Sequence, residues 1–126
     1  MDKLLKYSVL KYIPSPLSSE RFVLGIIFHE EESDYREFRL RQYLSPLSQL
    51  DAEIDIGLVE KLLRGIKEEV ESKTLSKPFD IEEFIRFYLN AYRFEGTKTV
   101  KYEVLDESIE SITQFYLGLD HKQSKD

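Results

Sequence analysis

The sequence contains no cysteine and no tryptophan, and it has only one methionine and two histidines. Without cysteine, disulfides, thiolate zinc sites and cysteine nucleophiles are excluded, which suits a reducing compartment such as the cytosol. No apolar run approaches the roughly 20 residues of a membrane-spanning helix. The start of the chain is too short and too polar for a signal peptide. We therefore expect a cytoplasmic protein that does not associate with membranes.

Motifs that hold phosphates, cofactors or catalytic side chains are also missing. The five glycines form no phosphate-binding loop, and the loop serines lack the strand–turn–helix context of a nucleophile. His29 precedes an acidic run at 30–34, but neighbouring carboxylates on a turn rarely converge on one metal ion. Such a run is typical of a solvated turn. The sequence therefore predicts no catalytic residue, no cofactor and no metal site.

The net charge of −6 is unevenly distributed. Residues 1–29 hold four basic and two acidic side chains, so they carry +2 and the remainder carries −8. An acidic chain has no general attraction to nucleic acid, because that attraction depends on Lys and Arg displacing counterions. A local basic patch that could still bind nucleic acid would consist of Lys6, Lys11, Arg36, Arg39 and Arg41.

What is present indicates one folded domain. The 126 residues are 41% hydrophobic and 33% charged, which is typical of a globular chain with a single core. Eight tyrosines and eight phenylalanines predict a core rich in large rings. We assign residues 1–119 to the domain and expect 120–126, which have little to bury, to form a frayed tail.

The strongest pattern is a pair of apolar strands, Tyr7–Ile13 and Arg21–His29, joined by a proline-containing loop. The second strand is apolar on both sides, which predicts a central position in a sheet. Strict alternation places Phe22, Leu24, Ile26 and Phe28 on one of its faces. Gly25 indicates close approach of a neighbouring side chain or backbone.

Later elements complete an α+β pattern. A third strand is expected at Tyr35–Gln42 and a fourth at Thr97–Leu105. The expected helices are Ile56–Ser72 after an Asp55 cap, a helix from an Asp80 cap to Tyr92, and a last helix capped by Asp106. Gly65, inside the first of these, is interpreted as tight packing against the sheet. Together they predict an antiparallel sheet of about four strands, with about three helices packed mainly on one face.

The third strand carries the candidate binding residues. Arg39 and Arg41 share its outward parity, and Arg36 lies near its start. Paired guanidinium groups suit binding to carboxylate or phosphate. An apolar helix packed over this side of the strand would desolvate two charges. We therefore expect this side to stay open to solvent or to meet an acidic partner. The alternative is an edge strand protected by charge, with its arginines neutralised by Glu37 and the acidic turn.

The first two strands resemble a known family. Residues Tyr7–Pro14 and Glu20–Phe28 are similar to the opening strands of a family of small uncharacterised bacterial proteins, a domain of unknown function. Those strands have the forms Tyr-Ser-Val-Leu-Lys/Arg-Tyr-Ile/Val-Pro and Glu-x-x-x-x-Gly-Val/Ile-x-x-Phe, and Phe87–Glu103 is similar to the second half of the family. Many members have asparagine where this chain has Leu24. The resemblance implies no established activity. In some members of the family the gene lies beside that of a toxin-type serine/threonine kinase, which implies a protein partner.

Three functions remain open from the sequence. The first is a non-catalytic cytosolic accessory protein, of bacterial or phage origin, that binds another protein through Arg36, Arg39 and Arg41, with a toxin-type kinase as the candidate partner. The second is an enzyme with dispersed residues, using His29, Tyr12 and Arg39. The third is a nucleic-acid-binding module that uses the local basic patch.

Overall fold

The structure is a computed structural model, and it describes residues 3–15, 17, 20–72, 79–86, 88 and 91–118. The expected tail at 120–126 and the linker at 73–78 lie outside the described residues, as does part of the first hairpin loop. In chain order the elements are β1 (Leu4–Tyr12), β2 (Phe22–Glu30), β3 (Tyr35–Leu40), α1 (Leu47–Leu50), α2 (Ile56–Glu71), α3 (Ile81–Ile85), β4 (Tyr92–Phe94), β5 (Lys98–Lys101) and α4 (Leu105–Leu117).

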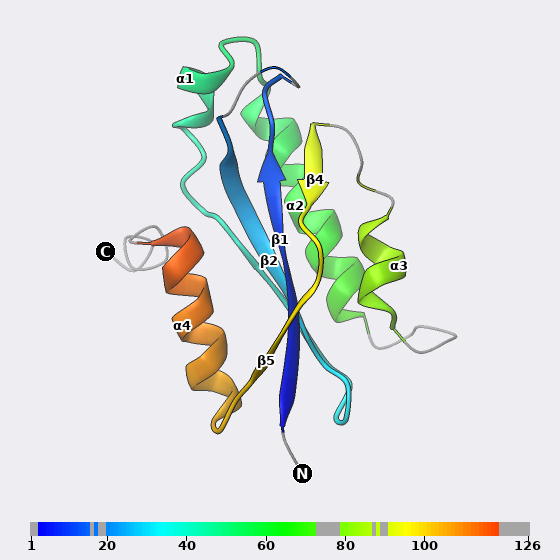
Figure 1. Cartoon of the computed structure of the whole chain (residues 1–126). Coiled ribbons are helices and arrows are strands. Elements are labelled where there is room, and N and C mark those ends of the chain that lie inside the picture. Colours follow the sequence, from blue (N-terminus) through cyan, green and yellow to red (C-terminus); the bar gives the residue numbers. More distant parts are fainter. Residues whose placement is uncertain are drawn as a thin grey trace.

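The described strands form one antiparallel sheet in the order β3-β2-β1-β4, with β5 also pairing with β1 (Figure 1). This confirms the predicted α+β class. β2 lies between β1 and β3, as its two apolar sides predicted. β4 and β5 flank the same side of β1, β4 pairing with residues 10–12 and β5 with residues 4–7.

A β-bulge in β2 decides which face each of its side chains takes. Leu10 of β1 pairs with Gly25, but Lys11 pairs with Val23, which leaves Leu24 as an extra residue. Leu24 therefore lies in the apolar cluster with α2, whereas Ile26 lies in the cluster with α4 on the opposite face. The strict alternation predicted from sequence, which put both on one face, was wrong because it assumed an unbroken ladder.

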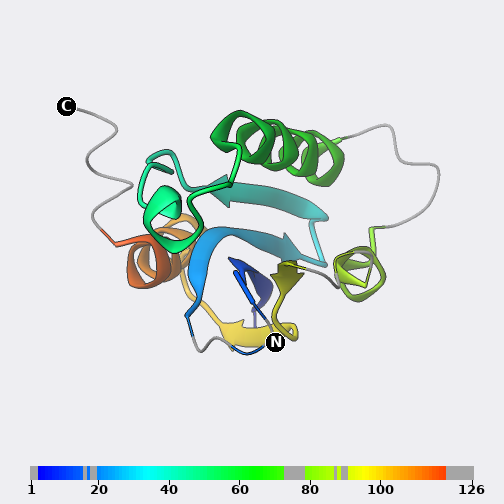
Figure 2. The ribbon, with the colours of Figure 1, turned by 90° about the horizontal axis from the view of Figure 1, so that it is seen from above.

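The helices lie mainly on one face of the sheet. Buried residues of α1, α2 and α3 join the first cluster, and those of α4 join the second. Seen from above, α2 and α4 lie on opposite sides of the sheet (Figure 2). α2 follows the prediction closely: the Asp55 side chain accepts a hydrogen bond from the Leu58 N–H at 3.2 Å, and the helix ends one residue early. Gly65, however, is exposed and touches nothing on the sheet, so that expectation was wrong.

The second predicted helix is shorter than expected. Asp80 caps α3 as predicted, accepting from the N–H groups of Glu82 and Glu83, but α3 ends at Ile85 and Tyr92 begins β4. The reason is tertiary: Tyr92 pairs with Tyr12, and the Ala91 carbonyl accepts from the Ile13 N–H. Pairing with β1 overrides a weak helical preference.

The fourth predicted strand is also shorter. β5 ends at Lys101, opposite Leu4 at the start of β1, and the Tyr102 N–H then donates to the Lys3 carbonyl at 3.0 Å. α4 then begins at Leu105 with Val104 as its N-cap, and this cap makes no side-chain hydrogen bond. Asp106 lies inside the first turn rather than at the cap, which corrects the prediction. Within the described part of the chain, no helix is long and apolar enough to cross a membrane.

Candidate functional site

β3 lies at one edge of the sheet, so one side of its backbone faces away from β2. The Arg41 N–H, just beyond β3, donates to the Leu24 carbonyl at 2.7 Å, toward the sheet. Because backbone groups alternate along a strand, those of Arg36 and Phe38 point outward. An edge of this kind is a template for another strand unless it is covered.

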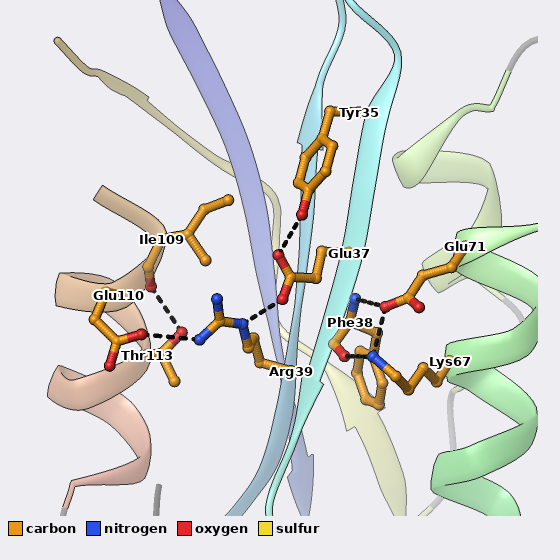
Figure 3. Close-up of polar contacts among 9 residues, drawn as sticks. All are labelled: Tyr35, Glu37, Phe38, Arg39, Lys67, Glu71, Ile109, Glu110 and Thr113. Carbon is orange, nitrogen blue, oxygen red and sulfur yellow. Dashed lines mark hydrogen bonds and ion pairs between the residues drawn. The ribbon is translucent and has the colours of Figure 1, made fainter. Parts of the chain in front are cut away.

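Two side chains of α2 cover this edge at Phe38. The Phe38 N–H donates to Glu71 Oε2 at 3.0 Å, and Lys67 Nζ donates to the Phe38 carbonyl at 3.1 Å (Figure 3). Lys67 and Glu71 also form an ion pair at 2.7 Å. The Lys67–Glu71 pair thus supplies the donor and acceptor that a neighbouring strand would supply. Sequence reasoning missed it, although the i, i+4 spacing of opposite charges was a usable signal.

Beside this pair, an open groove of about 620 Å³ runs along the edge. Its volume falls within the range of ligand-binding pockets. We call it the edge groove, and it is lined by Ser33, Asp34, Tyr35, Arg36, Glu37, Lys67, Glu71 and Leu105. It therefore combines the outward backbone of β3 with side chains from α2 and from the first residue of α4.

Arg39 lies on the α4 face of β3 and is held within the chain. Its Nε donates to Glu37, and its Nη1 donates to Glu110 of α4 at 3.0 Å (Figure 3). Burial alone would lower the pKa of the Arg39 guanidinium, but the two carboxylates outweigh burial and raise that pKa. From the sequence we expected this side of the strand to stay open to solvent or to meet an acidic partner. In the structure the acidic group comes from α4 of the same chain.

Glu37 connects Arg39 to the groove. Its second carboxylate oxygen accepts from the Tyr35 hydroxyl at 2.7 Å. This hydrogen bond, helped by burial, raises the pKa of Tyr35 to about 12. The phenol is therefore protonated at physiological pH and acts as a hydrogen-bond donor. Tyr35 is still 40% exposed and lines the groove.

The other two predicted arginines point elsewhere. Arg36 lies over the Phe79 ring at 5.4 Å with its side chain 8% exposed, and its Nη2 is 3.5 Å from Asp34. Arg41 donates to the Val23 carbonyl at 2.6 Å and lies 4.5 Å from the centre of the Phe22 ring. The three arginines do not form one patch, and of the three only Arg36 is among the residues lining the edge groove. Their role in partner binding stays a prediction.

The hairpin between β2 and β3 borders the groove and is held by hydrogen bonds to a buried carboxylate. Glu30 is 4% exposed and accepts from both the N–H and the hydroxyl of Ser33. The Ser33 hydroxyl lowers the pKa of the Glu30 carboxyl, more than burial raises it. Asp34 adopts a left-handed conformation with φ of 56°, and its carboxylate lies 3.0 Å from His29 Nε2.

Replacing Ser33 with alanine should lower the free energy of unfolding by about 1 kcal/mol at pH 7, because one hydrogen bond to a buried charge is lost. Since the folded pKa of Glu30 is lowered, its stabilisation is present above the ordinary value of 4.5 and is lost as pH falls through the folded value. Urea unfolding of wild type and Ser33→Ala should therefore differ at pH 7 and converge in acid. Ser48→Ala, an exposed serine in α1, is the control; an equal Ser33→Ala difference at all pH values would contradict the assignment.

The structure does not bring the proposed enzyme residues together. Tyr12 pairs with Phe22 at one end of the β1–β2 ladder, whereas His29 pairs with Lys6 near the other end, so they lie about 20 Å apart along the strands. Arg39 lies on the α4 face of the sheet, opposite His29, which contacts Phe79 in the α2 cluster. Tyr12, His29 and Arg39 therefore cannot act together on one small substrate.

The basic residues are also dispersed and paired. Lys6 lies 2.5 Å from Glu31, and Lys11 lies 2.8 Å from Glu95. Arg36 and Arg39 have the acidic partners described above. Pairing with carboxylates reduces the positive potential that nucleic-acid binding needs. Among the described residues, no group of three or more potential ligands could hold a metal ion.

These features define the class of protein: an α+β domain with an antiparallel sheet, one edge of which is covered by an ion pair beside an open groove. The chain belongs to the family described as "Protein of unknown function (DUF3037)", which matches residues 7–93. The matched region runs from within β1 into β4, and β5 and α4 follow it. No curated protein and no solved structure was found to match the chain.

Proposed function

We propose that this chain is a non-catalytic accessory protein that binds another protein through the edge groove. The observation that carries the proposal is an edge strand with an open groove of about 620 Å³ beside its outward-facing backbone. Extended peptides bind strand edges through main-chain hydrogen bonds, and side chains that line the groove supply specificity. Because Phe38 is already bonded to the Lys67–Glu71 pair, a peptide would bind beside this pair, at the outward backbone of Arg36 and on the side chains that line the groove.

The lining of the edge groove supports a protein partner. Tyr35 offers an exposed ring and a hydroxyl, and tyrosine is enriched among residues that dominate binding energy. Leu105 supplies a half-buried apolar surface. The charged lining residues include both signs, which suits hydrogen bonding to a peptide backbone better than attraction to a polyanion. For a cytosolic protein of bacterial or phage origin, a toxin-type kinase is the first candidate partner to test.

The test compares two exposed tyrosines, Tyr35 at the start of β3 and Tyr43 three residues after its end. Tyr35→Ala changes the groove, whereas Tyr43→Ala changes a ring that is 58% exposed and outside the groove lining. Wild-type protein should recover a specific partner from a lysate of the source cell, and a purified partner should bind Tyr35→Ala at least about tenfold more weakly. Tyr43→Ala should bind as wild type does, and both variants should melt near the wild-type temperature.

Equal binding by wild type and Tyr35→Ala would reject the edge groove as the interface. Replacing Arg39 by glutamate is a poorer test, because it breaks the contacts with Glu37 and Glu110 and changes stability as well. Salt-dependent retention of the protein on DNA or RNA would instead favour the nucleic-acid alternative.

A further inference from the structure

The outer side of α4 carries a row of four residues that begins and ends with an exposed apolar side chain. Val104 is 50% exposed and Phe115 is 80% exposed, and Ser108 and Ser111 lie between them. Val104 is the N-cap, and the three helical positions follow it at spacings of 4, 3 and 4 residues, so the row continues along one side of the helix. The same spacing forms the contact row of helices that pack against each other.

Next to this row, α4 and β5 border a second groove, which is shallow and open and has a volume of about 360 Å³. We call it the α4–β5 groove, and its lining residues are Val100, Lys101, Glu103, Val104, Glu107, Ser108, Ser111 and Ile112. β5 runs along the flank of the sheet and connects through a short loop to α4, which stands beside it (Figure 1). The two serines leave space that larger side chains would fill.

This side of the sheet has less helical cover than the other. α4 alone contributes buried helical residues to its apolar cluster among the described helices, whereas α1, α2 and α3 all contribute to the first cluster. Val100 of β5 and Ile112 of α4 both line the groove and are only partly buried. There is therefore room for a second helix to lie beside α4 on this face.

The charge of α4 decides which occupant fits. Its sequence contains Asp106, Glu107 and Glu110 and no Lys or Arg. Arg39 pairs with Glu110, but Glu107 lines the groove together with Glu103, and Lys101 is the one basic residue in that lining. A second copy of this chain would bring acidic α4 against acidic α4, and nucleic acid or an anionic lipid surface would be repelled as well.

We infer that the α4–β5 groove binds a basic amphipathic helix of a partner protein. The apolar face of that helix packs on Val104, Ile112 and Phe115, with one side chain inserted over the serines. Its Lys and Arg residues meet Glu103 and Glu107. This is the helix-in-groove mode of recognition, with anchors at i, i+3, i+4 and i+7. The inference rests on α4 and β5, and it holds whether or not the edge groove binds a partner.

The test uses a defined peptide probe and the whole chain. The probe is a helical peptide of about 18 residues, with leucines at i, i+3, i+4 and i+7 and lysines on the other positions. A scrambled peptide of the same composition controls for charge alone, and a version with glutamate in place of lysine controls for apolar contact alone. NMR titration of ¹⁵N-labelled protein should show shifts concentrated at β5 and α4, with the scrambled and acidic peptides binding at least about tenfold more weakly.

Two exposed residues provide a matched pair of variants. Phe115→Ser removes the aromatic ring of the row, whereas Leu58→Ser removes a leucine that is 61% exposed on α2. Phe115→Ser should weaken binding of the probe at least about fivefold, Leu58→Ser should leave it unchanged, and circular dichroism melting should show both folded. A second variant, Ser111→Arg, fills the groove with a positive side chain and should also weaken binding.

Several results would overturn the inference. Equal affinity for the ordered and scrambled peptides would reduce the interaction to general charge attraction. Shifts at the edge groove instead of α4 would place the helix elsewhere. Self-association of the free chain that Phe115→Ser abolishes would assign the row to a second copy, and retention on anionic vesicles that Phe115→Ser abolishes would assign it to lipid. None of these results depends on the Tyr35→Ala comparison, so the two proposals can fail separately.

Discussion

Replacing Gly25 with alanine should lower the free energy of unfolding by about 1–3 kcal/mol, the usual cost of forcing extra volume into a packed core. A Cβ atom at position 25 would lie 2.5 Å from Phe38 Cζ and 2.9 Å from the Arg39 carbonyl oxygen. Phe38 is fully buried, and the Arg39 oxygen belongs to the backbone of the adjacent strand, so neither can move away freely. The expected result is a lower midpoint in urea with an unchanged slope.

Two further variants make this result specific. Phe38→Leu in the Gly25→Ala background should restore part of the loss relative to the sum of the single variants, because it removes the ring atom nearest the new methyl group. Gly65→Ala is the matched control: nothing lies within 4 Å of its Cβ position, and alanine is the better helix former by about 1 kcal/mol. A Gly25→Ala protein as stable as wild type would show that the close packing of β2 on β3 is wrong.

The contrast between these glycines shows what the sequence could predict about the fold. An isolated glycine between apolar residues of a central strand has few explanations other than close approach, and that interpretation was confirmed. Gly65 lies in a helix whose buried side is already supplied by Val59, Leu63 and Ile66, so its position could have been placed on the exposed side. The same helical periodicity that predicted α2 places position 65 on the exposed side of the helix, but the interpretation of Gly65 did not use it.

Other features depended on contacts distant in sequence. The strand at Tyr92 exists because β1 offers it a partner, and β5 ends opposite Leu4, at the start of β1. Neither limit is visible in the local pattern around residues 92–105. The bulge at Leu24 is likewise a property of two paired strands, and one extra residue reverses the face of every side chain that follows it.

The candidate site was predictable only in outline. The charges of β3 correctly indicated an edge strand, because charge on a strand commonly protects an edge from pairing. The contact between Arg39 and Glu110 could not be predicted, because Glu110 lies 71 residues later in the chain. It reaches β3 only because α4 packs on the face of the sheet opposite α2. The spacing of Lys67 and Glu71 could have predicted the ion pair, but not its targets, because these are backbone atoms of Phe38 and carry no sequence signal.

Replacing Ile26 with alanine should cost about 2–5 kcal/mol, the sum of lost transfer free energy and a cavity. Ile26 is fully buried, pairs with Val9 of β1 and Arg39 of β3, and belongs to the cluster that contains Ile109 of α4. Its neighbours on three elements limit collapse around the cavity. Urea unfolding measures the loss, and Ile26→Val, which removes one methyl group, should cost only about 0.5–1.5 kcal/mol.

A double-mutant cycle turns this loss into a test of the bulge. If the extra residue at Leu24 directs Ile26 toward α4, Ile26→Ala and Ile109→Ala share one cluster and should deviate from additivity by about 0.5 kcal/mol or more. Ile26→Ala and Leu63→Ala lie on opposite faces of the sheet and should add within about 0.5 kcal/mol. An unbroken ladder predicts the reverse, because Ile26 would then share the face of Leu24 and lie toward α2. If the losses in unfolding free energy at Ile26 and Ile109 added and those at Ile26 and Leu63 did not, the bulge would be disproved. The assignment of the side chains from Gly25 to Glu30 to the two faces would then be wrong as well.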